Sequence, residues 1–174
     1  MPYADALTAV LAAVALVAGH HAGDRWLQTD HQAVTKGACT HAGRAACTGH
    51  VATLTLAQLA MLALVLAATG TGVSPLALLL GLGLNAASHW WADRRFTLRG
   101  LVLATDPIAH KSGYYGNGGA EPLDQAFHFV WIVPCALVIA SPAPLALALT
   151  GAGVLLLAAA EAASRWARTR EHTG

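Results

Sequence analysis

The stretch ALTAVLAAVALVAGHHAGDRWLQ, residues 6–28, runs from an apolar segment straight into two histidines, an aspartate and an arginine. A helix of about 20 apolar residues can cross a hydrocarbon core roughly 30 Å thick. No basic segment precedes the run, and it carries Asp5 instead, so we interpret it as an uncleaved spanning helix and not as a secretory signal. The ionisable groups at its end need an explanation, because such groups are costly in a membrane unless they are paired or liganded.

The composition of the whole chain agrees with a membrane protein. Its 174 residues are 56% hydrophobic and only 11% charged, and the mean hydropathy is +0.52. A formal net charge of +1 gives no reason to expect a nucleic-acid partner. Three cysteines are too few for a disulfide framework.

Four further apolar runs follow the first, each bounded by polar residues or by Pro and Gly. Long runs rich in Ala and Leu favour helices, since isolated strands leave backbone groups unpaired in lipid. We therefore predict an all-α fold, a polytopic membrane helical bundle of five transmembrane helices that forms a single integral membrane domain over residues 1–174. The predicted helices span about 4–27, 49–69, 75–97, 122–140 and 144–168.

The distribution of basic residues predicts the orientation of this bundle. In a five-helix arrangement all ten Lys and Arg residues fall on one side, and the positive-inside rule makes that side the cytoplasm. We predict an integral membrane protein with its N-terminus outside and its C-terminus inside. The lipid bilayer is its first partner, and the oligomeric state is left open.

Histidine and aspartate recur four residues apart at the cytoplasmic ends of the predicted helices. Residues with this spacing share one face of a helix. Imidazole nitrogen and carboxylate oxygen are ligands for Zn²⁺ and similar ions. The pattern therefore predicts a site for a divalent metal, zinc, that holds one or two ions. The candidate ligands are His20 and Asp24 in the first helix, His50 in the second, His89 and Asp93 in the third, and Asp124 and His128 in the fourth.

Two other interpretations compete with this metal site. Each pair could be only interfacial, with its side chains solvated by headgroups and water. A different zinc motif could use Cys39, His41, Cys47 and His50 in CTHAGRAACTGH, but that spacing matches no standard zinc finger.

The longest connection, roughly Leu98 to Glu121, contains HKSGYYGNGGAEP. We expect this segment to be a loop, since its Gly and Asn residues permit tight turns. Lys111, Tyr114 and Tyr115 are candidates to bind an anionic or aromatic substrate there.

The segments HHAGDRWLQTDHQAVTKG, SHWWADRR and DQAFH, together with His50, resemble an uncharacterised family of small bacterial and phage polytopic membrane proteins. Its motifs are HxxGDxxLQ with a downstream Lys, a lone His, HxxxD and DQxxH, and the resemblance covers about residues 20–130. The family is distantly similar to predicted membrane-bound metal-dependent hydrolases, which implies metal and hydrolysis. The resemblance adds Gln28, Lys36 and Gln125 as candidate substrate-binding residues.

The expected function is hydrolysis of a phosphoester or amide by a metal-activated water, with Asp24, Asp93 and Asp124 as catalytic candidates. The substrate would be a small or lipid-like molecule that enters from the cytoplasmic side. One alternative is a metal- or proton-coupled transporter, although transporters usually place polar groups near the membrane midplane. Another is a non-enzymatic interaction protein in which the His and Asp side chains only satisfy each other.

Overall fold

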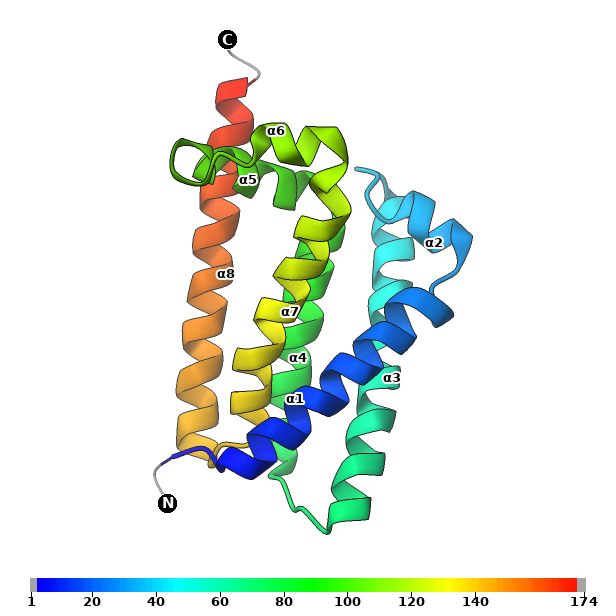
Figure 1. The fold of residues 1–174 in the computed structure, drawn as a ribbon, viewed down its shortest axis with the longest axis vertical. Helices are drawn as coiled ribbons and strands as arrows, with labels where there is room; N and C mark the ends of the chain where they lie inside the picture. Colours follow the sequence, from blue (N-terminus) through cyan, green and yellow to red (C-terminus); the bar gives the residue numbers. More distant parts are fainter. Residues whose placement is uncertain (1–2, 172–174) are drawn as a thin grey trace.

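The computed structural model describes residues 3–171, and every regular element in that range is helical, as the sequence predicts (Figure 1). Long helices pack side by side, and shorter elements gather at one end of the bundle. The elements in chain order are α1 (Ala6–His21), the π-helical segment η1 (Ala22–Leu27), α2 (Asp30–Thr35), α3 (His41–Thr69), α4 (Pro75–Asp93), α5 (Phe96–Ala109), α6 (Ser112–Tyr114), the π-helical segment η2 (Tyr115–Gly119), α7 (Ala120–Ile139) and α8 (Ala143–Glu171).

Four segments are long and apolar enough to cross a membrane: Ala6–Leu27, His41–Thr69, Ser112–Ile139 and Ala143–Glu171. Helix α4 is not among them, because Asn85, His89 and other polar residues in its second half lower its mean hydropathy. Those polar residues are buried between the other helices.

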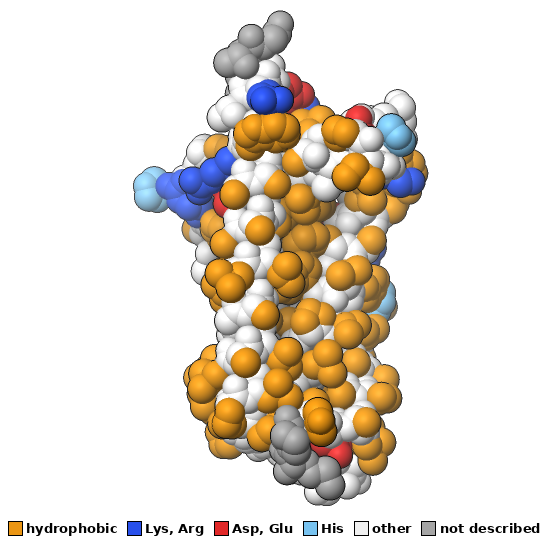
Figure 2. All heavy atoms as spheres, turned by 90° about the vertical axis from the view of Figure 1, so that its left-hand side faces the viewer, with side chains coloured by type: hydrophobic (Ala, Val, Ile, Leu, Met, Phe, Trp, Pro, Cys, Tyr) orange, Lys and Arg blue, Asp and Glu red, His pale blue; other side chains and the backbone are white. Residues whose placement is uncertain are grey.

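The bundle interior is apolar where the helices meet. Helix α1 packs mainly on α3, and α4 packs on α7 and α8. Leu16, Leu62, Ala77, Ile132 and Ile139 belong to one buried cluster contributed by α1, α3, α4 and α7. Many large apolar side chains face outward instead, and they cover the α8 side of the molecule along most of its height (Figure 2). Such a surface is expected of a protein whose solvent is lipid and not water.

The two ends of the bundle differ in charge. The N-terminal segment reaches the turn between α7 and α8, where the Asp5 N–H donates to the Ala140 carbonyl at 3.0 Å. Helices α2, α5 and α6 and the end of α8 lie at the opposite end (Figure 1). The segments that carry the ten Lys and Arg residues lie at this second end or between it and the middle of the bundle, and we call this end the basic end.

Several helix limits differ from those predicted from hydropathy. Helix α3 begins at His41 and not near 49, because the Thr40 hydroxyl accepts a hydrogen bond from the Gly43 N–H (3.1 Å) and caps a polar first turn. Helix α4 ends at Asp93 and not near 97, since Arg95 adopts a left-handed φ of 58° and turns the chain into α5. Helices α7 and α8 differ from the prediction by only a few residues at each end.

The prediction of an irregular loop from Leu98 to Glu121 is wrong. Helix α5 occupies the first half of this segment, and α6 and η2 precede α7, with non-helical backbone at Asn117 and Gly118 inside η2. The Asp106 carboxylate accepts a hydrogen bond from the Ser112 N–H at the start of α6 (2.7 Å), and this bond lowers the pKa of Asp106. The Gly-rich sequence is therefore a kinked helical entry to α7.

Candidate metal centre

Side chains from η1, α3, α4 and α7 converge inside the basic end of the bundle. Asp24 comes from η1, His50 from α3, His89 and Asp93 from α4, and His128 from α7. The four-residue spacing of His89 and Asp93 puts both on the inner face of α4, as the sequence predicts. The three histidines and Asp93 are almost completely buried, which is unusual for such polar groups unless they serve each other or a ligand.

Two glycines let the first helix come close enough to contribute Asp24. A Cβ atom on Gly19 would lie 2.4 Å from Gln58 Cα, and one on Gly23 would lie 2.7 Å from Leu54 Cα. The pair forms a Gly-x-x-x-Gly pattern, which permits close approach of helix backbones in membranes. The π-helical turn from Ala22 to Leu27 begins at the same level, and such turns are frequent at functional sites.

Three ligand atoms form a nearly equilateral triangle at the centre. His50 Nε2 lies 3.2 Å from His89 Nε2, and each of these two atoms lies 3.3 Å from Asp93 Oδ2. Atoms bound to one tetrahedral zinc ion at about 2.0–2.1 Å are separated from one another by about 3.3 Å. The triangle therefore has the dimensions of one face of a tetrahedral site. Asp24 Oδ1 lies 3.2 Å from His50 Nε2 and 4.0 Å from His89 Nε2, which makes Asp24 the candidate for a fourth ligand.

The donor set also contains atoms that lack a hydrogen bond. Asp93 Oδ2 and His128 Nε2 are buried without a hydrogen-bonding partner among residues 3–171, whereas Asp93 Oδ1 has the Lys36 ammonium 2.7 Å away. His128 Nε2 lies 3.8 Å from Asp93 Oδ1 and 3.3 Å from Asp124 Oδ2, in poor hydrogen-bond geometry. Such orphaned polar atoms are costly, and a divalent cation would satisfy them. The residues present therefore fit a metal ion, in either of two groups that share His89: Asp24, His50 and His89, or His89, Asp93 and His128.

Two further predicted ligands lie beside these groups and not inside them. His20 Nε2 lies 3.2 Å from the Gln125 amide oxygen, and its ring centroid is 5.3 Å from those of His89 and His128. The Gln125 amide nitrogen donates to Asp24 Oδ2 at 2.7 Å. His20 and Gln125 thus orient Asp24, and Gln125, a candidate to bind substrate, also lines the adjacent cavity. Asp124 contacts His128 and is partly exposed.

Lys36, a candidate to bind substrate, is buried against the carboxylates and also lines the cavity beside them. Its Nζ lies 2.7 Å from Asp93 Oδ1 and 3.8 Å from Asp24 Oδ1. The buried Arg94 guanidinium holds the backbone around Lys36 by donating to the Lys36 carbonyl at 2.7 Å and to the Ala38 carbonyl at 2.6 Å. In the sequence, Arg94 is one of the ten cations on the predicted cytoplasmic side. Arg94 directly follows the candidate ligand Asp93, and this position is the sequence signal that places Arg94 near the site.

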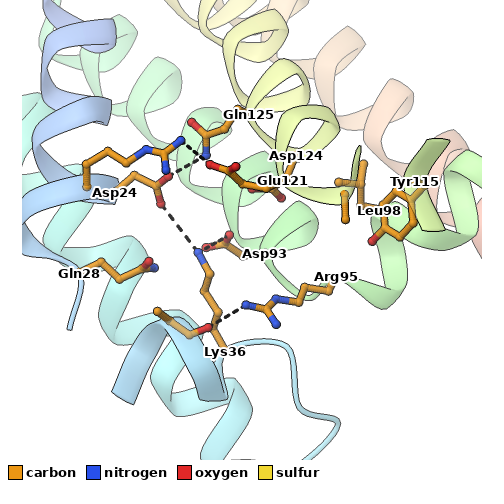
Figure 3. A pocket seen from close by; sticks show the side chains of 13 residues that line it. Asp24, Gln28, Lys36, Asp93, Arg95, Leu98, Tyr115, Glu121, Asp124 and Gln125 are labelled. Carbon is orange, nitrogen blue, oxygen red and sulfur yellow. Dashed lines mark hydrogen bonds and ion pairs between the residues drawn. The ribbon is translucent and has the colours of Figure 1, made fainter. Parts of the chain in front are cut away.

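A cavity of about 290 Å³ opens beside the candidate ligands (Figure 3). Asp24 and Asp93 belong both to its wall and to the ligand groups, and Gln28, Tyr115 and Asp124 line it as well. Lys111 and Tyr114 are not among the described residues that line it. Lys111 Nζ lies over the Tyr114 ring instead, 5.3 Å from its centroid. Of the three substrate candidates in the HKSGYYGNGG segment, only Tyr115 faces this cavity.

The competing cysteine motif is not assembled. Cys39 is exposed, whereas Cys47 is buried and its thiol lies 3.7 Å from the Trp90 carbonyl. Neither cysteine belongs to a possible metal-holding group within the described residues. His21 is exposed and its ring contacts Phe129.

Comparison of the chain with protein-family models, with curated proteins and with solved structures gave no match. The geometry of the site is therefore the observation on which a functional conclusion rests.

Proposed function

We propose that this protein is a membrane-embedded hydrolase that uses one divalent metal ion, zinc, to cleave a phosphoester or amide. The observation that carries the proposal is the triangle of His50 Nε2, His89 Nε2 and Asp93 Oδ2, with sides of 3.2–3.3 Å, beside a cavity open to substrate. The resemblance of its motifs to predicted membrane-bound metal-dependent hydrolases agrees with this chemistry.

In the membrane, α4 is the fifth spanning helix of the proposed topology, enclosed by the four more apolar ones. The concentration of Lys and Arg at the basic end supports a cytoplasmic location for that end, with the N-terminus outside, in the inner membrane of a bacterium. The substrate then enters the cavity from the cytoplasmic side.

His50, His89 and Asp93 hold the metal in this proposal, and Asp24 supplies the fourth ligand atom. Nitrogen and carboxylate oxygen are both common zinc ligands. When bound, the ion would polarise the scissile group and lower the pKa of water toward about 7. Gln125 fixes the second oxygen of Asp24 through its 2.7 Å hydrogen bond, so that Asp24 Oδ1 stays directed at His50.

Asp124 is the proposed general base. It is the only one of the three catalytic candidates outside both ligand groups, and it lines the cavity with its side chain 21% exposed. His128 Nε2 lies 3.3 Å from Asp124 Oδ2, close enough to share the proton that Asp124 takes from water.

The transporter alternative is less well supported. The deepest polar side chains, Gln58 and Asn85, are bonded to each other, since Asn85 Nδ2 donates to Gln58 Oε1 at 2.8 Å. Gln58 Nε2 donates to the Leu16 carbonyl at 3.3 Å. These groups join three helices and leave the ionisable cluster at one end of the bundle, whereas transporters bind their cargo near the midplane.

The proposal is tested by comparing three variants of purified, metal-loaded protein against a panel of phosphate esters and amides. Asp124→Asn should keep its metal and lose about 10²–10⁴-fold in turnover, as expected for a lost general base. His89→Ala should lose both metal and turnover, and His21→Ala, changed at an exposed position, should keep both. Turnover that is equal in all three variants would refute the proposed site.

A further inference from the structure

The cavity beside the ligand groups has a wall whose free groups are hydrogen-bond donors. Each of its four carboxylates already has a partner: Asp24 and Asp93 belong to the ligand groups, Glu121 Oε1 lies 2.6 Å from the Arg25 guanidinium, and Asp124 lies against His128. The acceptor capacity of the wall is therefore largely used.

The hydrogen-bond donors of the cavity wall still have N–H groups that can bind a ligand. Gln28 Nε2 is buried and has no hydrogen-bonding partner within the part of the chain that the structure describes. Arg95 donates one bond, from Nη2 to the Ala33 carbonyl (2.8 Å), and a guanidinium carries five N–H groups. The Lys36 ammonium has three N–H groups, contacts Asp93 Oδ1 at 2.7 Å with one side, and also faces this cavity (Figure 3). A ligand that offers only acceptors matches this wall better than one that must also donate.

The net charge of the cavity wall also favours a ligand that offers acceptors, namely an anion. Four carboxylates stand against three cations, Arg25, Lys36 and Arg95, so one bound divalent ion would turn the formal balance of the cavity positive. In a partly buried site such a balance favours an anion. An amide carries no charge and has an N–H that would need one of the occupied acceptors.

The cavity also lies at a level where phosphate groups of lipids are found. Trp26 and Leu27, directly after the wall residue Arg25, are exposed on the outer surface. Exposed tryptophan at the end of a spanning helix is typical of the headgroup region.

We propose that this cavity binds the phosphate group of a phosphate ester, with Gln28, Lys36 and Arg95 as donors to its oxygens. The inference rests on the proposed function, in which the metal groups lie at the cavity wall, and it selects phosphate over amide. Cleavage would join the water oxygen to phosphorus and break the ester P–O bond, while the leaving oxygen takes up a proton.

Binding of glycerol 3-phosphate to metal-loaded protein tests the proposal by calorimetry, with unbound metal removed and metal content measured in each sample. Gln28→Leu and Arg95→Gln should each weaken binding about 10-fold or more, the loss expected for one hydrogen bond to a charged group. Arg44→Gln, a change of an exposed cation in α3 away from the cavity wall, should leave binding unchanged.

Two further arms identify the source of the phosphate. Phosphatidic acid in mixed micelles is compared with phosphatidylcholine micelles, and an uncharged amide, N-acetylalaninamide, replaces the phosphate ester. Binding of glycerol 3-phosphate supports a soluble ester, and binding of phosphatidic acid alone supports a lipid headgroup. Protein that holds its metal but binds neither phosphate, or that prefers the amide, would overturn this inference and leave the metal site standing. Protein without metal would overturn the proposed function itself.

Discussion

Replacing Gly19 with alanine should separate α1 from α3 and weaken the metal site. The new Cβ atom would lie 2.4 Å from Gln58 Cα and 2.8 Å from Gln58 N, whereas ordinary contacts begin near 3.4 Å. Because both atoms belong to the backbone of α3, no side chain can rotate away, and the helices must move apart by about 1 Å. Overpacking of this kind costs about 1–3 kcal/mol, and contact with backbone places Gly19→Ala near the upper value.

Gly83→Ala is the matched control, since no atom described by the structure lies within 4 Å of a Cβ built at Gly83. Both glycines lie inside helices, so alanine gives each variant a similar gain in helix propensity of about 1 kcal/mol. The difference in the free energy of unfolding between the two variants then isolates the overpacking cost, about 3 kcal/mol.

The same displacement should be measurable at the site. Metal ligands must hold their distances to within about 0.2 Å, so a movement of α1 by about 1 Å removes Asp24 from the set. The assay is unfolding in detergent together with a metal titration, and Gly19→Ala should bind metal at least about 10-fold more weakly than Gly83→Ala. Equal unfolding midpoints and equal metal affinities in the two variants would refute the close approach of α1 and α3.

Three other predictions test the topology, the support of the site and its occupant. In a Cys39→Ser background, Gly72→Cys should react with an impermeant thiol reagent from outside intact cells, and Gly113→Cys only after permeabilisation; the reverse pattern would contradict the proposed orientation. Arg94→Lys keeps the charge but loses the hydrogen bonds to two carbonyls, so it should destabilise the protein by about 2 kcal/mol and speed hydrogen exchange in α2. Unchanged hydrogen exchange would contradict the role of Arg94 in holding that segment. Chelator should lower the melting temperature of the parent protein, because a ligand at about 100 times its Kd adds about 2.7 kcal/mol of stability, and a melting curve that does not respond to chelator would contradict bound metal.

The ligand cluster could be predicted from the sequence because its signal is local. Four-residue spacing of His89 and Asp93 fixes a shared helix face, and hydropathy places the ends of the helices that carry His50 and His128 at one depth. The structure brings these side chains together as predicted. Their assignment to one triangle could not be predicted, since spacing within a helix says nothing about distances between helices.

The support of the cluster depends on contacts that no local pattern encodes. Arg94 binds the carbonyls of Lys36 and Ala38 and so holds the Lys36 ammonium against Asp93, an arrangement that no spacing along the sequence encodes. The close approach of α1 to α3 depends on Gly19 and Gly23, and their Gly-x-x-x-Gly spacing is the sequence signal for it. The start of α3 was missed because a polar, capped first turn gives no hydropathy signal.

The most direct test of the account is the metal content of the purified protein and of two histidine variants. Parent protein, His89→Ala and His21→Ala are dialysed in the same detergent against buffer that contains zinc and then against metal-free buffer, and bound metal is measured by mass spectrometry. The account predicts about one ion per chain in the parent and in His21→Ala, and less than about a tenth of that in His89→Ala. A parent protein without bound metal, or a His89→Ala variant that retains as much metal as the parent, would contradict the claim that His50, His89 and Asp93 form a metal site.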